Sequence, residues 1–414
     1  MFSREENELL TRVGLGTPMG SLMRRYWLPA ALSEEIPSPD CPPVRVRLLG
    51  QDLVALRDTE GKVGLLDEHC SHRGTSLFYG RNEECGLRCI YHGWKYDIHG
   101  NVLDTPAEPA DSDFRTKIRH PAYPCREAAG IVFAYLGPPD KIPLFPNYEW
   151  VNLPDERVQV IKAYLECNYL QGIEGDFDSS HTTFLHCNNL ADLARLNRDG
   201  APTLEAEATD YGMRSISIRS LADGQSYVRI SAFILPAFSI VPGPATARFA
   251  ENDSRAFRFW IPRDDTSTWF YILTMRDTAF SDDERVSARS WIDAKYRKIR
   301  NASNDYLQDR ELQRTRIYSG IKAVIPAEQD ACATESMGPI YDRTQEHLGY
   351  SDKTIIALRR ILLEAARSVQ DGKEPPHLIT DATLNEFSRL RAVKGVLPTG
   401  RSWRELPELA KVCL

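Results

Sequence analysis

The chain has 414 residues, which is enough for two or three domains with hydrophobic cores of their own. Hydrophobic residues make up 42% and charged residues 26%, an ordinary composition for a globular protein. The formal net charge of −7 is spread over interspersed acids and bases, so we expect neither a nucleic acid nor an anionic membrane as a partner.

The sequence also indicates where the protein works. Glu5 and Glu6 stand where the apolar run of a signal peptide would begin. The longest apolar stretch, residues 230–242, contains two serines and an internal proline and is shorter than the roughly twenty residues that span a bilayer. An odd number of cysteines, nine, favours a reducing compartment. We therefore expect a cytoplasmic protein without disulfides.

The first part of the chain, residues 1–155, is predicted to be an all-β domain. A hairpin turn is expected at residues 58–61, and four prolines between residues 138 and 146 mark the end of the domain. Its strands are predicted over residues 44–49, 53–57, 63–66 and 131–136.

The second part, residues 156–414, is predicted to be an α+β domain with an antiparallel sheet flanked by helices, which makes the whole chain α+β. Gly372 is expected to end the last long helix. Strands are predicted over residues 213–221, 227–240, 257–261 and 268–274, and helices over residues 283–300 and 355–369.

Two short motifs in the first part combine thiols with imidazoles. Cys70-Ser71-His72 is followed, after sixteen residues, by Cys89-Ile90-Tyr91-His92. One cysteine and one histidine from each loop suit a two-iron cluster in which thiolates hold one iron and imidazoles the other. Structural zinc is the alternative, although zinc fingers normally group their cysteines and their histidines separately. The pattern therefore favours a protein that carries electrons.

Neighbouring cysteines and histidines do not fit this pattern. Cys85 has Arg88 at its third following position, and His69 is out of register. The remaining thiols are expected to be structural or exposed: Cys41, Cys125, Cys167, Cys187, Cys332 and Cys413.

A second metal site is predicted around His181 and His186. They are five residues apart and Asp178 precedes the first by three, so on a helical turn the three side chains can face one direction. Two histidines with one carboxylate and open positions suit non-haem Fe(II) that activates oxygen. The alternatives are that the histidines are core residues, and that Asp178 caps the following helix.

Both motifs resemble those of a known family. The first, with Gly93-Trp94-Lys95-Tyr96 after it, resembles the Rieske signature, with Ser71 where many members carry proline. Asn168, Glu174, Asp178 and the two histidines resemble the mononuclear-iron segment of Rieske oxygenases. The resemblance extends from residues 20–27 to residues 342–347 and is closest to the phthalate dioxygenase-like branch. It implies a second domain of the helix-grip type.

The resemblance also implies the ligands of both metal sites. Cys70, His72, Cys89 and His92 would hold a Rieske [2Fe–2S] cluster. His181, His186 and a later carboxylate would hold one Fe(II). Asp330 is the expected third ligand, with Glu328 and Glu335 as competitors. Asp178 would be a catalytic residue that bonds an iron histidine on one side and His72 or His92 of an adjacent subunit on the other.

The resembling enzymes are terminal oxygenases that hydroxylate, dihydroxylate or O-demethylate aromatic compounds with O2. The resemblance implies NADH as the electron source through a flavin-containing reductase, with or without a ferredoxin, and assembly as a homotrimer or stacked trimers. No dinucleotide-binding glycine motif is found in the chain itself. A carboxylated substrate would need an arginine. The candidates are Arg214, Arg219, Arg229 and Arg248.

Two other classes of protein are compatible with the sequence. A Rieske-type electron carrier would need only the first hundred or so residues and no second iron. A scaffold protein could keep metal motifs that no longer bind metal. The apolar segment 233–238 is similarly ambiguous, because it could line a substrate pocket or pack in the core.

Overall fold

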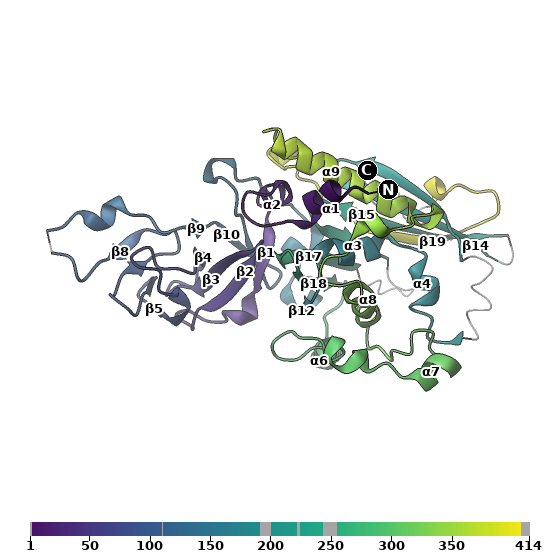
Figure 1. The fold of residues 1–414 in the computed structure, drawn as a ribbon, viewed down its shortest axis with the longest axis horizontal. Helices are drawn as coiled ribbons and strands as arrows, with labels where there is room; N and C mark the ends of the chain where they lie inside the picture. Colours follow the sequence, from purple (N-terminus) through teal and green to yellow (C-terminus); the bar gives the residue numbers. More distant parts are fainter. Residues whose placement is uncertain (1, 110, 191–199, 222–223, 243–254, 407–414) are drawn as a thin grey trace.

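The computed structural model describes residues 2–109, 111–190, 200–221, 224–242 and 255–406. The molecule is elongated, with a smaller β-rich part on the left of Figure 1 and a larger part of sheet and helices on the right. The α+β class and the two parts of different architecture are confirmed. Within the described ranges, no helix has the length and apolar character to cross a lipid bilayer.

The smaller part is built from three antiparallel sheets of short strands. Two have four strands, in the orders β2-β3-β4-β9 and β5-β6-β7-β8, and one has three, β1-β11-β10. The strands are β1 (Leu28–Leu32), β2 (Val44–Leu48), β3 (Gln51–Arg57), β4 (Val63–Asp67), β5 (Arg81–Glu83), β6 (Gly86–Arg88), β7 (Lys95–Tyr96), β8 (Val102–Asp104), β9 (Ala122–Tyr123), β10 (Cys125–Ala128) and β11 (Ile131–Ala134). The predicted hairpin turn is confirmed, because the Gly61 N–H donates to the Asp58 carbonyl at 2.9 Å.

The larger part contains one eight-stranded antiparallel sheet in the order β12-β18-β17-β16-β15-β14-β13, with β19 paired to β15. Its strands are β12 (Val158–Leu165), β13 (Thr203–Thr209), β14 (Gly212–Ser220), β15 (Ser226–Ile234), β16 (Phe238–Ile240), β17 (Arg255–Asp264), β18 (Ser267–Met275) and β19 (Val393–Leu397). Its long strands alternate buried and less buried side chains where one face meets helices.

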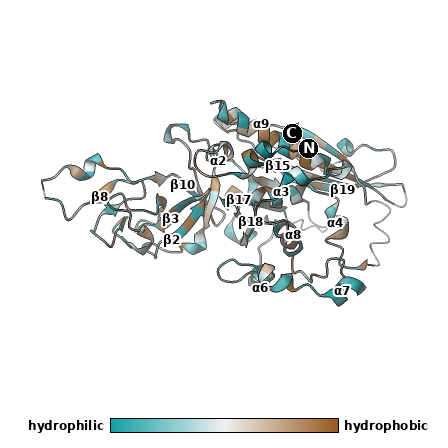
Figure 2. Cartoon of the chain, viewed as in Figure 1, coloured by the Kyte–Doolittle hydropathy of each residue, from teal (hydrophilic) through white to brown (hydrophobic). Residues whose placement is uncertain are grey.

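Helices lie on and around this sheet (Figure 1). They are α1 (Arg4–Thr11), α2 (Pro18–Met23), α3 (Tyr169–Phe177), α4 (His181–Phe184), α6 (Asp282–Arg289), α7 (Arg310–Thr315), α8 (Pro326–Glu335) and α9 (Lys353–Gln370). Figure 2 shows hydrophobic and hydrophilic residues along α9, while α7 is mostly hydrophilic. The apolar stripe of α9 packs against α2, α3 and β13. Gly372, with φ +75°, follows its end as predicted.

Two predicted elements are wrong in extent. Residues 227–240 form not one strand but β15 and β16, separated by a turn that contains Pro236. The helix predicted over residues 283–300 ends at Arg289. Beyond it, the Asp293 carboxylate accepts backbone N–H groups of Lys295 and Arg297 at 2.7 and 2.9 Å. A short acidic side chain that binds nearby N–H groups favours a turn over a helix.

The two parts share a hydrophobic core. Phe133 of β11 packs on Phe259 of β17 with ring centroids 6.0 Å apart. In addition, the backbone N–H of Leu49, at the turn after β2, donates to the Pro262 carbonyl at 3.0 Å. A second, smaller core is formed by residues of β3, β4, β6, β7 and β8 together with Cys70 and Cys89. The two cysteines are therefore fixed by packing as well as by their loops.

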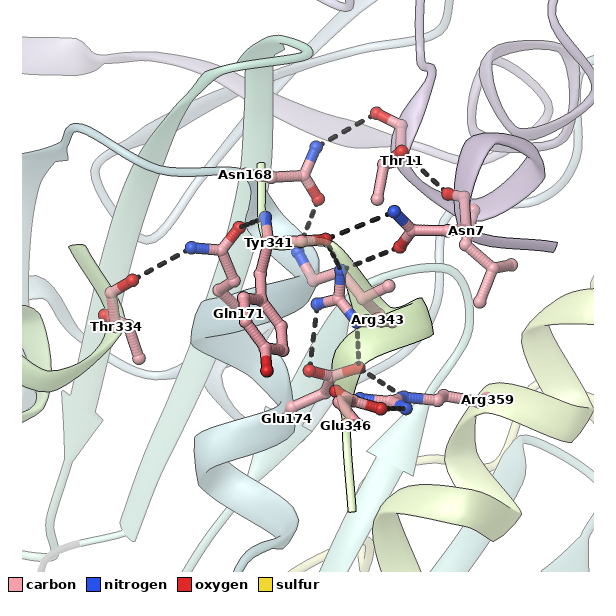
Figure 3. Close-up of polar contacts among 12 residues, drawn as sticks. Asn7, Thr11, Asn168, Gln171, Glu174, Thr334, Tyr341, Arg343, Glu346 and Arg359 are labelled. Carbon is pink, nitrogen blue, oxygen red and sulfur yellow. Dashed lines mark hydrogen bonds and ion pairs between the residues drawn. The ribbon is translucent and has the colours of Figure 1, made fainter. Parts of the chain in front are cut away.

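A buried network of ion pairs holds α3 against α1 and α9 (Figure 3). Glu174 on α3 accepts two bonds from the Arg343 guanidinium, at 3.1 and 2.9 Å, and one from Arg359 of α9 at 2.7 Å. Arg343 also donates to Asn7 of α1, and Arg359 pairs with Glu346. Because every charge here is paired and hydrogen-bonded, the cluster can be buried without a large desolvation penalty.

Replacing one member of this network should be costly. Burial alone would raise the pKa of Glu174, but the charges of Arg343 and Arg359 outweigh it and hold the pKa below its ordinary value. Glu174→Gln should lower the free energy of unfolding at pH 7 by roughly 3–5 kcal/mol, because it leaves buried guanidinium groups unpaired. The matched change at exposed Glu364 on α9 should cost less than about 0.5 kcal/mol.

The lowered pKa of Glu174 also makes the free energy of unfolding depend on pH. A carboxyl whose pKa is lowered by folding stabilises the protein above its unfolded pKa and loses this contribution as the pH falls through the folded pKa. Urea unfolding should therefore show the gap between wild type and Glu174→Gln fully at pH 7 and narrowing below about pH 4. A gap that is constant or widens on acidification would contradict the assignment.

Candidate metal centres and oxygenase site

The two Cys/His motifs fold into equivalent loops. In the first, the Gly74 N–H donates to the Cys70 carbonyl at 2.8 Å, and in the second the Gly93 N–H donates to the Cys89 carbonyl at 3.1 Å. Both glycines have φ +76°, a conformation that a residue with a side chain adopts only with strain. The spacing Cys-x-x-x-Gly in one loop therefore has the same structural role as in the other.

The four side chains sort into two pairs. Cys70 and Cys89 are buried beside each other, and His72 and His92 lie further out with ring centroids 4.5 Å apart. His72 stacks on Trp94 at 4.7 Å, which fixes its ring plane.

This arrangement favours a two-iron cluster over zinc. A single zinc ion would hold all its ligand atoms at 2.0–2.3 Å and therefore close together. Among the described residues, one group of three metal-binding side chains has ligand atoms that all lie within 4.8 Å of one another. This group is formed by His181, His186 and Asp330, and not by the Cys/His loops. Buried thiolates on one side and outward imidazoles on the other fit a [2Fe–2S] cluster with two chemically different irons.

The second site is assembled by two helices of the larger part. His181 opens the short helix α4, His186 follows its end, and Asp330 lies on α8. The Nε2 atoms of the two histidines are 3.2 Å apart, and Asp330 Oδ1 lies 3.6 Å from the first and 3.1 Å from the second. Two imidazoles and one carboxylate converging from one side match the ligand set of oxygen-activating non-haem iron.

Each imidazole is oriented through its other nitrogen. Asp178 Oδ2 faces His181 Nδ1 at 3.6 Å, and His186 Nδ1 lies 2.9 Å from Gln329 Oε1. Gln329 is buried, and its amide nitrogen donates to Ser319 Oγ and to the Ile321 carbonyl at 3.0 Å each. The amide oxygen must therefore face His186, so that His186 carries its proton on Nδ1 and presents a free Nε2.

The local fold explains the position of Asp178. It ends α3, and its Oδ1 accepts backbone N–H groups of Ser180 and His181 at 2.8 and 3.3 Å. The predicted alternative, in which Asp178 is the N-cap of the following helix, is wrong, because Ser180 is the N-cap of α4, although Asp178 does bind backbone N–H groups at its start. Burial would raise the pKa of Asp178, but the bond and charge of His181 outweigh it and lower the pKa. Asp178 is an ionised acceptor.

The competitors of Asp330 are engaged elsewhere. Glu328 pairs with Arg300 at 2.7 Å, and Glu335 pairs with Lys298 at 2.6 Å and accepts the Tyr306 hydroxyl at 2.6 Å. Burial of Asp330 itself would raise its pKa, but the two nearby histidines and Arg258 lower it. Sequence reasoning missed Gln329, whose only signal is its place directly before the predicted carboxylate.

The candidate arginines fall in different surroundings. Arg214 lies 3.7 Å from Glu207, and Arg229 donates to the Pro242 carbonyl at 2.9 Å. Arg219 donates to Ser179 Oγ and Thr182 Oγ1, at 3.0 and 3.3 Å, and so lies against the loop that carries His181. Arg248 lies outside the described residues. The segment 233–238, with Phe233 fully buried, packs in the main core.

Comparison with known proteins agrees with this geometry. Residues 26–124 match the Rieske [2Fe-2S] domain, and residues 134–412 match the family described as LigXa C-terminal domain like. The phthalate 4,5-dioxygenase oxygenase subunit of Pseudomonas putida is 39% identical, covering 90% of this chain and 88% of that protein. The 3-chlorobenzoate-3,4-dioxygenase oxygenase subunit of Comamonas testosteroni is 37% identical, covering 91% of each.

Solved structures show the same fold. The structure of NdmA from Pseudomonas putida CBB5 aligns with a TM-score of 0.61 over 93% of this chain and all of that chain, at 20% identity. The chain belongs to the Rieske non-haem iron oxygenases, as the terminal oxygenase (alpha) subunit of a multicomponent system. It is an oxidoreductase that incorporates molecular oxygen, carries a Rieske cluster and a mononuclear iron, and takes electrons from a separate protein component.

Proposed function

We propose that this oxygenase acts on an aromatic carboxylate, with residues 1–155 as the electron-transfer domain and residues 156–414 as the catalytic domain. Cys70, His72, Cys89 and His92 hold the [2Fe–2S] cluster, and His181, His186 and Asp330 hold Fe(II). The observation that carries the proposal is the convergence of the last three side chains in a chain that also contains both Cys/His loops. A pure electron carrier would have no use for the second site.

When bound, the cluster would supply single electrons and the Fe(II) would supply the chemistry of dioxygen activation. The protein supplies orientation. Asp178 and Gln329 hold the two imidazoles so that both Nε2 atoms face Asp330. The ion pairs of Glu328 and Glu335 keep the neighbouring carboxylates away from the same metal.

The surroundings of Asp178 support a role at a contact between two subunits. One of its oxygens faces His181, and its side chain is 28% exposed, so a second chain can reach it. His72 and His92 are likewise only partly buried. Since the two metal sites of one chain lie in different parts of an elongated molecule (Figure 1), we propose a homotrimer or stacked trimers in which Asp178 bonds His72 or His92 of the next subunit.

The relatives and the arginines support an aromatic carboxylate as the substrate. The two relatives above are named for phthalate and chlorobenzoate, both aromatic carboxylates. Arg219 is the candidate that lies against the His181 loop, where Nη1 donates to Ser179 Oγ and Ser217 Oγ, and Nη2 to the Ser179 carbonyl and Thr182 Oγ1. A substrate carboxylate would replace some of these acceptors, because a guanidinium can bind a carboxylate through two hydrogen bonds. We propose Arg219 as the group that faces the substrate carboxylate. Electrons would come from NADH through a flavin-containing reductase, with or without a ferredoxin.

A substrate screen tests this function. The purified chain, supplied with NADH and a surrogate reductase, should consume oxygen and form a hydroxylated, dihydroxylated or demethylated product from benzoate-type acids. The matched methyl esters should react at least tenfold less efficiently in kcat/KM, because they lack the anion that Arg219 would bind. Equal turnover of acids and esters, or oxygen uptake without product from every acid, would contradict the proposal.

Asp330→Ala tests the third iron ligand. Removing one of three protein ligands should deplete the mononuclear iron and abolish turnover, while the visible spectrum of the cluster stays unchanged. Metal analysis with optical spectroscopy checks this. Cys332→Ser, two residues further along α8, serves as the control and should keep both metals. If Asp330→Ala retains iron and activity, the ligand is another carboxylate, with Glu328 and Glu335 next.

Asp178→Ala tests whether Asp178 connects the two metal sites for electron transfer. Because Asp178 is not proposed to bind metal directly, the variant should keep both metals and its substrate affinity, while electron transfer from cluster to iron slows by at least a hundredfold. Stopped-flow oxidation of the reduced cluster in single-turnover experiments measures this step. Loss of either metal, or normal transfer with both metals present, would contradict the role.

A further inference from the structure

A buried histidine outside both ligand sets lies directly behind the first cluster loop. His120 is only 1% exposed, and both ring nitrogens are engaged. Its Nε2 lies 2.9 Å from the Asp67 carbonyl, and its Nδ1 lies 2.8 Å from Ser71 Oγ. Because a carbonyl can only accept, Nε2 carries the proton, and the Ser71 hydroxyl donates to Nδ1 of the neutral ring. Ser71 stands between the ligands Cys70 and His72.

The ring of His120 also packs on Tyr96. Their centroids are 4.4 Å apart with an interplanar angle of 33°, and Tyr96 is fully buried. The Tyr96 hydroxyl lies 3.0 Å from Cys70 Sγ. A cysteine that holds iron is a thiolate and can only accept, so in the loaded protein the hydroxyl donates to the sulfur. The contacts thus run from Asp67 and Ser71 through His120 and Tyr96 to a cluster ligand.

This connection has a consequence for the cluster. A hydrogen bond to a ligand sulfur stabilises the additional negative charge of the reduced form more than the oxidised form, and therefore raises the reduction potential. The strength of the bond depends on where the Tyr96 hydroxyl is held. The tyrosine ring has little freedom while one face is covered by His120, and His120 is itself fixed by two hydrogen bonds.

We propose that His120 is a positioning residue for the [2Fe–2S] cluster: anchored by Ser71 and Asp67, its ring keeps the Tyr96 hydroxyl on Cys70 Sγ and thereby raises the reduction potential of the cluster. The inference rests on the proposed assignment of Cys70 and His72 as cluster ligands. Ser71 has a specific part in it, because a proline at this position would have no hydroxyl to anchor the ring.

The experiment is a redox titration of the purified protein, followed by the visible and paramagnetic signals of the cluster. Tyr96→Phe keeps the ring but removes the hydroxyl, and should make reduction about tenfold less favourable, a fall of roughly 59 mV in the one-electron potential. His120→Leu should lower the potential in the same direction, and Ser71→Ala should lower it less. His99→Gln, a change at an exposed histidine nearby, should leave the potential unchanged.

A double variant separates positioning from a general effect on the loop. If His120 acts through Tyr96, adding His120→Leu to Tyr96→Phe should change the reduction equilibrium by less than about twofold, because the bond is already absent. Fully additive shifts, or an unshifted potential in His120→Leu, would overturn this inference alone. A wild-type protein without the cluster spectrum would overturn the proposed function and this inference together.

Discussion

The active site depends on one constraint, which is that two imidazoles are held through their Nδ1 atoms so that both Nε2 atoms face the same point. Asp178 holds His181 and Gln329 holds His186, and each holding group has its own fixed partners. Helix α8 supplies both Gln329 and Asp330, so it orients one histidine and places the carboxylate with a single element. Helix α3, which is followed directly by Asp178, is fixed in turn by the buried pairs of Glu174 with Arg343 and Arg359.

The second requirement is a separate place for the electron carrier. The small core around Cys70 and Cys89 is distinct from the main core, although the two parts of the chain also share packing through Phe133 and Phe259. The cysteines are buried and the histidines face outward, so a cluster held by them would have a protected side and an accessible side. This polarity fits electron delivery to a neighbouring molecule, because an iron held by the two imidazoles would be the one near the surface.

Much of this arrangement could be predicted from local sequence. Loop spacing identifies the Cys/His motifs, and the five-residue separation of His181 and His186 predicts that they face one direction, as their 3.2 Å Nε2 separation shows. Strand and helix periodicity gives most elements. It fails where a proline divides residues 227–240 and where the Asp293 carboxylate competes for backbone N–H groups after residue 289.

Contacts between residues far apart in the chain could not be predicted from the sequence. No spacing rule connects Asp330 to His186, 144 positions earlier, and the expectation of Asp330 came from a resemblance. Gln329 carries no motif, since a glutamine beside a carboxylate is common on helices. Likewise Glu174 could be associated with the iron segment, but its partners Arg343 and Arg359 become visible only in three dimensions.

One measurement tests most directly whether the chain contains two different iron sites. Iron and acid-labile sulfide are determined in parallel in the purified protein after anaerobic reconstitution. We predict about three irons and two sulfides per chain, two irons in the cluster and one at the histidine–carboxylate site. About two irons with two sulfides would mean that the larger part binds no iron, and zinc without sulfide would contradict the cluster itself.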